Sequence, residues 1–143
     1  MLSSTSKYAL RVLAALADRG SDDYVLRSVL ADDTEIPSDY LGKVLLALGC
    51  AGIVEGQRGR GGGYRLTRDP SDVSLIEAVE VFEGVRAHPS CLIGVHEDCS
   101  DATPCSAHGM FREVRAQYIS FLTGTSIADI ARTEAPSLPG RLW

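Results

Sequence analysis

The sequence contains no long hydrophobic run. Its first residues, 1–7, lack the apolar stretch of a secretory signal peptide, and no segment approaches the roughly 18 apolar residues of a membrane-spanning helix. We therefore expect a cytoplasmic protein without a membrane partner. The chain has 143 residues, which is enough to bury a substantial hydrophobic core.

An excess of positive charge is also missing. The formal net charge is −5 at pH 7, which at first argues against nucleic acid as a partner. Residues 1–70 carry nine Lys or Arg and nine Asp or Glu, whereas residues 71–143 carry five and ten, so the acidity lies in the second half. DNA responds to the local field of the docking surface. A segment without acidic residues, 56–68, contains Arg58, Arg60, Arg65 and Arg68.

Cysteine is scarce, and no arrangement resembles a nucleophile beside a general base. In a compartment that keeps thiols reduced, the four cysteines are better suited to metal binding, redox sensing or core packing than to structural disulfides. The carboxylates of Glu97, Asp98 and Asp101 have no nucleophile beside them, and we interpret them as an exposed acidic loop. The sequence therefore does not indicate an enzyme.

The first half of the chain has the pattern of a helix-turn-helix. Apolar spacing predicts a first helix from an N-cap at Thr5 to near Gly20, and a short helix over residues 27–33. Pro37 disfavours helix at the residue before it and indicates a turn. Ser38 is the expected N-cap of a longer helix over residues 39–51, with a buried face formed by Tyr40, Leu41, Val44, Leu45 and Leu48.

A hairpin rich in glycine and arginine is predicted next. Two short β-prone segments, at residues 52–55 and 64–66, flank the sequence Gln57-Arg58-Gly59-Arg60-Gly61-Gly62-Gly63. Glycines let the tip adopt positive φ and approach another surface closely. A hairpin directly after a helix-turn-helix is typical of a winged helix-turn-helix.

The second half is predicted to be helical around an irregular loop. The expected elements are a helix over residues 75–83, an irregular segment over 86–108, a long amphipathic helix over 109–122 and a short helix from a cap at Thr125 or Ser126 to Ile130. We divide the chain into a winged helix-turn-helix domain (1–72), a sensor loop with a dimerisation helix (73–132) and a disordered tail (133–143).

These elements predict the residues that face DNA. The exposed side of the 39–51 helix would enter the major groove, and the hairpin would reach an adjacent minor groove or phosphates. A solvated hairpin is the alternative for the arginines, but their position after a helix-turn-helix favours a DNA contact, with Arg60 as the main candidate. The predicted contact residues are Ser4, Thr5, Ser38, Asp39, Lys43, Arg58, Arg60 and Arg65.

Three segments resemble a known family of bacterial regulators. They are residues 2–10, Ile36-Pro37-Ser38-Asp39-Tyr40-Leu41 and Arg58-Gly59-Arg60-Gly61-Gly62-Gly63-Tyr64-Arg65-Leu66. They look like the Rrf2 family, in particular its IscR-like and NsrR-like members, and the resemblance extends over residues 2–132. It implies a mainly helical fold with a small β-hairpin wing. It also implies a homodimeric transcriptional regulator, a repressor or dual regulator, bound to a two-fold symmetric operator on double-stranded DNA.

The long helix over 109–122 carries an apolar stripe. Its members are spaced 3-4-3, as in knobs-into-holes packing. From spacing alone, packing within the same domain explains the stripe equally well. The resemblance favours a two-fold interface, because a short DNA-binding unit usually needs a second half-site. The stripe consists of Phe111, Val114, Tyr118 and Phe121.

Three cysteines and a histidine are grouped before this helix. Cys91, Cys99 and Cys105 have the spacing C-x7-C-x5-C, and His108 follows as C-x2-H. Thiolates and an imidazole this close in sequence can surround one iron–sulfur cluster or zinc ion. The alternatives are a cluster-free thiol switch and a site that no longer binds metal. A metal-binding module that uses the hairpin against a protein partner is the rival from another class of function.

The family resemblance implies that the three cysteines hold a 2Fe–2S or 4Fe–4S cluster, although the seven-residue gap is longer than in the best-known sensors. It offers two fourth ligands: a histidine shortly after the last cysteine, matched by His108, or an acidic residue at the start of the partner's first helix. The corresponding residue here is Lys7, whose ammonium has no lone pair. The sequence therefore favours His108.

The remaining cysteine and histidines are expected to have structural or solvent-exposed positions. Cys50 lies among apolar residues and is predicted to be a buried core residue. His88 and His96 are expected to be exposed, with His96 as an alternate ligand. Together these predictions describe a regulator whose operator affinity is controlled by a cluster, or by the redox state, of the three-cysteine loop.

Overall fold

The computed structural model describes residues 2–20, 22–86, 91–95 and 99–131. The predicted tail, 133–143, and the residues His88, His96, Glu97 and Asp98 lie outside this part of the chain. The mainly helical fold with a small β-hairpin is confirmed. Its elements are α1 (Ser4–Asp18), α2 (Arg27–Thr34), α3 (Ser38–Cys50), β1 (Val54–Gln57), β2 (Gly63–Leu66), the 3-10 helix η1 (Pro70–Asp72), α4 (Leu75–Glu83), α5 (His108–Gly124) and α6 (Ile127–Ala131).

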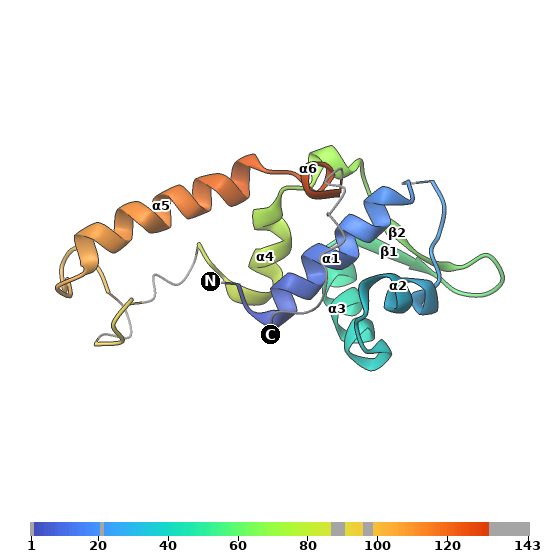
Figure 1. Ribbon diagram of the computed structural model, residues 1–143, viewed down its shortest axis with the longest axis horizontal. Coiled ribbons are helices and arrows are strands. Elements are labelled where there is room, and N and C mark those ends of the chain that lie inside the picture. Colours follow the sequence, from blue (N-terminus) through green and yellow to red (C-terminus); the bar gives the residue numbers. More distant parts are fainter. Residues whose placement is uncertain (1, 21, 87–90, 96–98, 132–143) are drawn as a thin grey trace, which may run out of the picture.

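The elements form a rounded body with two projections (Figure 1). Helices α1 to α4 and α6 make the body, the β1–β2 hairpin projects from one end, and α5 projects as an arm from the other. The cysteine-bearing segments lie at the far end of α5. The predicted DNA-contacting hairpin and the predicted sensor are therefore at opposite ends of the molecule.

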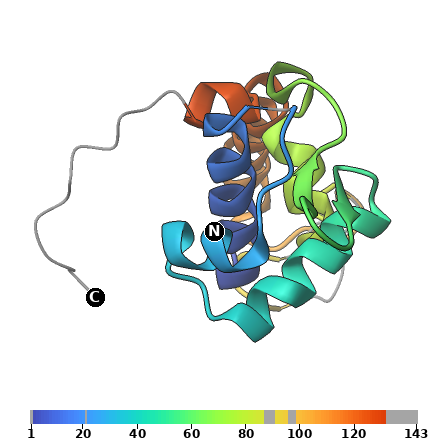
Figure 2. The ribbon, with the colours of Figure 1, turned by 90° about the vertical axis from the view of Figure 1, so that its right-hand side faces the viewer.

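Helix α1 is the centre of the core and contacts α2, α3, α4, α6 and β2 (Figure 2). Its buried residues recur at i, i+3, i+4 and i+7, which is the spacing of one helical face. The buried stripe of α3 has the same spacing and faces this core. The two stripes consist of Ala9, Val12, Leu13 and Leu16 in α1, and of Leu41, Val44, Leu45 and Leu48 in α3.

The turn of the helix-turn-helix lies where Pro37 predicted it. Helix α2 ends at Thr34, Glu35 adopts a left-handed conformation with φ 53°, and α3 begins directly after Pro37. Arg11 of α1 donates a hydrogen bond to the carbonyl oxygen of Thr34. This contact fixes the end of α2, and so the start of α3, against the central helix.

Two predicted helix caps are wrong. Ser3, not Thr5, is the N-cap of α1, and its hydroxyl accepts a hydrogen bond from the Ser6 backbone N–H at 3.2 Å. Ser38 is already inside α3, and Pro37 occupies the cap position without a side-chain hydrogen bond. A proline with fixed φ fits the extended cap conformation, so the preference of serine for caps did not locate the boundary. Helix α5 is also longer than the predicted 109–122.

The glycine run joins the hairpin to the body as well as turning its tip. Val54 pairs with Leu66 at the base of the hairpin, and Gln57 pairs with Gly63 next to its tip. Gly63 has φ 142°, and an added Cβ would lie 2.3 Å from the carbonyl oxygen of Val25. Val25 and Tyr64 exchange two backbone hydrogen bonds of 2.8 Å. This close approach requires glycine at position 63 and holds the hairpin beside α2.

Helix α5 is attached to the body at its C-terminal end. All of α5 is described, and Leu122 is its one buried residue. Beyond it the chain returns to the body, because the Ile127 N–H donates to the Val73 carbonyl at 2.8 Å and the Leu75 N–H donates to the Thr125 carbonyl at 2.9 Å. One end of the arm is thereby anchored, while the other reaches outward. None of the helices in the described residues is long and apolar enough to cross a membrane.

Candidate DNA-binding surface and metal centre

The outer face of α3 carries the residues predicted to read DNA. Ser38, Asp39 and Lys43 are all exposed. Asp39 and Lys43 line a shallow hollow of about 570 Å³ that also involves Arg27 of α2 and Tyr64 of the hairpin. The surface therefore combines both helices of the helix-turn-helix with the base of the hairpin.

Two expectations for the side chains of α3 are wrong. Cys50 is exposed rather than buried, because the core stripe of α3 ends at Leu48 and resumes only at Ile53 after the turn. Tyr40 is 36% exposed, and its ring packs edge-on against Tyr8 with centroids 5.4 Å apart. The hydrophobic pattern identified the correct face of α3, but the buried stripe is shorter than predicted at both ends of the helix.

The start of α1 is joined to α3 by a hydroxyl pair. Thr5, which was predicted to contact a phosphate, forms a hydrogen bond with the Tyr40 hydroxyl. Ser4, the other predicted residue there, is exposed. Thr5 thus links the first turn of α1 to the first turn of α3, whereas Ser4 is open to a partner.

The predicted hairpin arginines have two different environments. Arg58 and Arg60 are exposed at the tip, and neither forms an ion pair with a residue that the structure describes. Arg65 donates from Nε to Glu55 at 2.6 Å, and its guanidinium lies 4.6 Å from the Tyr24 ring centroid. The hydrogen bond from Arg65 is the main cause that lowers the pKa of Glu55. Arg65 therefore braces the hairpin, while the tip arginines present uncompensated charge.

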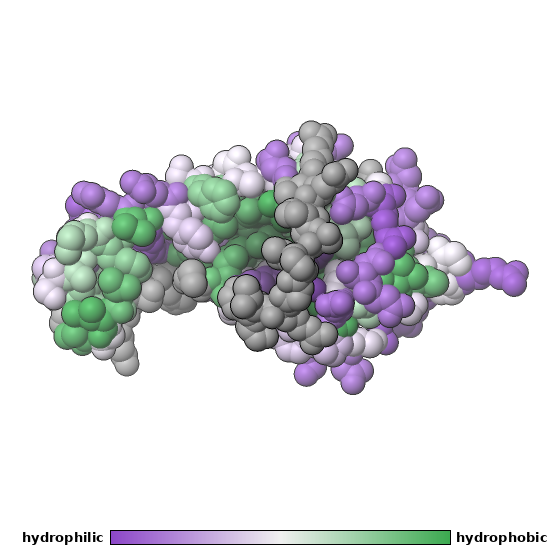
Figure 3. All heavy atoms as spheres, viewed as in Figure 1, coloured by the Kyte–Doolittle hydropathy of each residue, from purple (hydrophilic) through white to green (hydrophobic). Residues whose placement is uncertain are grey.

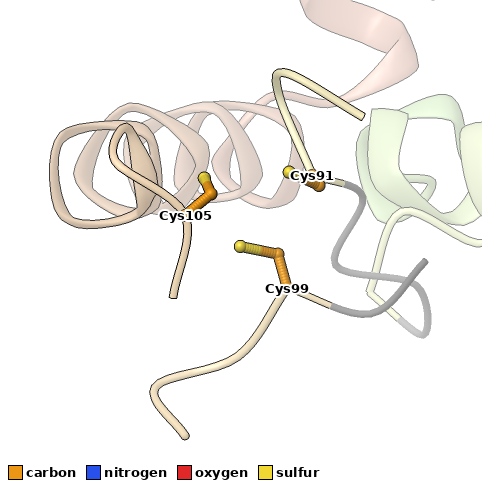
Figure 4. Close-up of side chains that lie close together, drawn as sticks. All are labelled: Cys91, Cys99 and Cys105. Atoms are coloured by element: carbon orange, nitrogen blue, oxygen red, sulfur yellow. The ribbon is translucent and has the colours of Figure 1, made fainter. Parts of the chain in front are cut away.

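Three sulfur atoms converge near the start of α5. The Sγ atoms of Cys91, Cys99 and Cys105 all lie within 4.8 Å of one another, and they point toward a common centre (Figure 4). Cys99 is buried, and the other two are half-buried. Residues from three separate turns are therefore gathered into one set of soft donors, which suits an iron–sulfur cluster or zinc.

His108, the first residue of α5, lies beside this set. Its Nδ1 lies 3.1 Å from the Cys99 Sγ, and its Nε2 lies 3.0 Å from Oδ1 of Asp101. Arg112 donates to the same carboxylate oxygen at 2.8 Å. When the Nε2 N–H donates its hydrogen bond to Asp101, Nδ1 keeps its lone pair and faces the sulfur atom of Cys99. The hydrogen bond from His108 is the main cause that lowers the pKa of Asp101, followed by the charge of Arg112.

The electrostatics of the cysteines fit a bound cation. The Cys105 amide lowers the pKa of Cys99, but burial and the neighbouring thiols of Cys105 and Cys91 raise it, and the net pKa lies above the usual value. The Cys99 thiol therefore resists ionisation on its own. A metal centre supplies the positive charge that thiolates require, so the donor set is matched to such a group.

The predicted dimer stripe lies along the exposed side of α5. Val114 is 60% exposed and Phe121 is 57% exposed, whereas Phe111 and Tyr118 are half-buried. Apolar side chains gather at the outer end of the arm and in the recess beside it (Figure 3). A groove of about 490 Å³ is lined by Leu2, Lys7, Phe111, Val114, Arg115 and Tyr118.

Comparison with known proteins shows the family. The profile of the Rrf2 family, described as an iron-dependent transcriptional regulator, matches residues 2–133. The chain belongs to the Rrf2 family. An rrf2-like HTH-type transcriptional regulator of Rhodobacter capsulatus is 33% identical over 144 residues, with 96% of both chains covered. The HTH-type transcriptional regulator NsrR of Bacillus licheniformis is 30% identical over 129 residues, with 90% of both covered.

The solved structures agree on the fold. CymR, the global cysteine regulator of B. subtilis, superposes with a TM-score of 0.75 at 24% identity, covering 92% of this chain and 95% of that one. The winged helix-turn-helix prediction is therefore confirmed. This Rrf2 chain is a transcriptional regulator like its homologues, and the prediction that it is not an enzyme is confirmed by them.

Several residues of the candidate sites of this Rrf2 regulator were missed by sequence analysis. Arg27 and Leu46 line the same hollow as Asp39 and Lys43, and Leu46 could have been found because it falls outside the buried stripe of α3. Asp101 and Arg112 support His108, but they are seven residues before it and four after it, and no sequence period relates all three. That contact depends on how the loop folds back.

Replacing Asp101 by Asn should weaken metal binding about 10- to 100-fold, because the carboxylate that orients His108 is lost. The measurement is a zinc titration of the reduced protein against a competing chelator. Glu113→Gln is the matched control, because it removes the same charge from exposed α5. Equal zinc affinities for the two variants would contradict a role for Asp101.

Proposed function

We propose that this chain is a homodimeric, cytoplasmic repressor or dual regulator whose operator affinity depends on an iron–sulfur centre held by Cys91, Cys99, Cys105 and His108. The observation that carries the proposal is the convergence of three Sγ atoms within 4.8 Å of one another. They lie at the start of the helix with the exposed apolar stripe, in a chain that also carries a winged helix-turn-helix. Zinc in the same donor set is the second candidate, because Cys3His is a common structural zinc site.

The charge distribution supports DNA as the partner. Arg58 and Arg60 are exposed on the tip of the hairpin, which projects at one extremity of the molecule (Figure 1), and Arg27 of α2 and Lys43 of α3 line the hollow beside it. Ser38, Asp39 and Lys43 would approach base edges in the major groove, with Ser4 near a phosphate. Residues 56–68 contain no acidic residue, so the acidity of the second half of the chain does not fall within the hairpin.

The exposed side of α5 supports a dimer. An isolated helix with Val114 and Phe121 more than half exposed leaves apolar surface in water, which a second copy would cover. Phe111, Val114, Tyr118 and Phe121 fall on one stripe, so two antiparallel α5 helices would contact along it. Two winged units would then face half-sites about one helical turn, ~34 Å, apart on a two-fold symmetric operator.

A chain of contacts connects α5, which begins beside the cysteines, to α3. Arg115 of α5 donates to the Val85 carbonyl, just after α4, and Glu83 at the end of α4 accepts from the Ser3 N–H at 2.6 Å. Burial raises the pKa of Glu83, but hydrogen bonds from Ser6 and Ser3 lower it by more. The net pKa is below the usual value, so the carboxylate is ionised at neutral pH. Ser3 caps α1, whose Thr5 bonds to Tyr40 at the start of α3.

This path gives the proposed regulation a physical basis. Ligation at the cysteines would constrain how the chain leaves α4 and enters α5, and the contacts at Glu83 and Thr5 would pass that constraint to α3. The cluster supplies the redox chemistry, and the protein residues supply its position and its connection to the helix-turn-helix. A shift in relative stability of a few kcal/mol between two arrangements is enough to change occupancy of the operator.

Replacing Arg60 by Ala should weaken operator binding by about 1–3 kcal/mol if Arg60 contacts a base. If it contacts only phosphate, binding should weaken equally for all sequences, and the salt dependence should become shallower by about one unit. The measurement is the dissociation constant across a salt series. Arg68→Ala is the control, because Arg68 carries the same charge but pairs with Glu77 at 2.5 Å. An unchanged affinity and an unchanged salt dependence in Arg60→Ala would show that the hairpin tip does not contact DNA.

Replacing Cys99 by Ala should abolish the cluster, because its sulfur is the buried member of the triad and lies 3.1 Å from His108 Nδ1. Wild-type protein purified without oxygen is expected to be coloured and to contain iron and acid-labile sulfide, and the variant is expected to contain neither. Cys50→Ala is the matched control, because Cys50 is an exposed cysteine outside the triad. Zinc without iron or sulfide in the wild type would establish the second candidate, and metal-free thiols would contradict both.

A further inference from the structure

Helix α3 presents one large apolar side chain that the core does not use. Leu46 is 69% exposed, more than any other large hydrophobic residue in the described part of α1 to α4. It follows Lys43 by three positions and precedes Cys50 by four, so the three side chains share one face of the helix. This face is directed away from the buried stripe and forms part of the hollow beside the hairpin.

Two glycines, Gly42 and Gly49, flank Leu46 on this face of α3, so no side chain stands beside it at these two positions. Glycine weakens a helix interior relative to alanine. At Gly49 an added Cβ would meet only the Val54 carbonyl oxygen at an ordinary 3.8 Å, and at Gly42 it would meet the end of the flexible Arg27 side chain at 3.1 Å. Internal packing therefore does not require glycine at position 49. The absence of side chains there lets the backbone of α3 approach a partner closely, with Leu46 as the most prominent contact.

The charge around Leu46 points to DNA rather than to a second protein. Arg27 and Lys43 line the same hollow, and Asp39 is the one acidic residue among those that line it. Of the other large apolar residues that line the hollow, Leu45 is buried and Tyr64 is half-buried, so Leu46 does not belong to the continuous exposed apolar patch of a protein interface. The major groove of DNA, in contrast, combines polar base edges with one apolar group, the 5-methyl group of thymine.

We propose that Leu46 recognises the 5-methyl group of a thymine in each operator half-site. The inference rests on the proposed function, because it requires α3 to lie in the major groove. Leu46 stands about 4.5 Å further along the helix axis than Lys43, at ~1.5 Å per residue. A base-pair step is about 3.4 Å. The thymine is therefore about one step from the base that Lys43 faces.

Removal of single methyl groups from the DNA tests this contact. The probe is the duplex that the full-length protein enriches from a random-sequence pool, with each thymine replaced in turn by deoxyuridine. Wild-type protein should bind about fourfold more weakly when one particular thymine of each half-site loses its methyl group, the equivalent of ~0.8 kcal/mol. The other thymines of the same duplex are the internal controls and should be insensitive.

The variant Leu46→Ala should bind more weakly and should lose this sensitivity. Because Leu46 is exposed, the variant should keep the thermal stability of the wild type. Lys43→Ala is the control, because it should weaken binding while keeping the deoxyuridine effect. No deoxyuridine effect in the wild type, or the same effect in Leu46→Ala, overturns the inference and leaves the proposed function standing. Failure to enrich any sequence overturns the proposed function and the inference together.

Discussion

The burial of one face of α1 is the constraint on which the rest of the molecule depends. Ala9, Val12, Leu13 and Leu16 are removed from water, and complete burial of a Val or Leu side chain contributes about 1.5–3 kcal/mol. The same helix contacts α2, α3, α4 and α6. Since α6 anchors the end of α5, a single packed helix positions both the DNA-facing surface and the arm that bears the cysteines.

The two ends of α1 have different roles in this arrangement. Its C-terminal end is tied to α2 by Arg19, which pairs with Asp33 at 2.5 Å. Its N-terminal end is tied to α4 through Ser3 and Glu83 and to α3 through Thr5 and Tyr40. The ties to α3 and α4 are polar and lie near the surface, so they can rearrange at lower cost than the apolar core. In the proposed regulation, a signal from the cysteines would reach α3 through the N-terminal end of α1.

Sequence patterns predicted the features that depend on periodicity and on glycine or proline. The helices, the turn at Pro37 and the hairpin follow from apolar spacing and from backbone limits, and all were found. The caps at Thr5 and Ser38 were wrong because several residues can satisfy the first turn of a helix. The burial of Cys50 was wrong because an apolar neighbourhood in sequence does not specify which side of a helix end faces the core.

The candidate metal site could be predicted only in part. The sequence placed Cys91, Cys99, Cys105 and His108 in one group, but the carboxylate of Asp101 behind the imidazole depends on how the loop folds back. The sequence likewise did not predict the different environments of the hairpin arginines, because nothing in it distinguishes Arg65 from Arg60. Only tertiary contacts show that Arg65 pairs with Glu55 and Arg60 does not.

The most direct test is the operator affinity of one wild-type preparation with and without its metal centre, measured without oxygen before and after removal of iron by a chelator. The two dissociation constants are expected to differ about 5- to 150-fold, the usual range of coupling between two sites. Cys99→Ala should show a single affinity that the chelator does not change. Equal affinities for the loaded and the iron-free wild type would contradict control of DNA binding by the cysteine site.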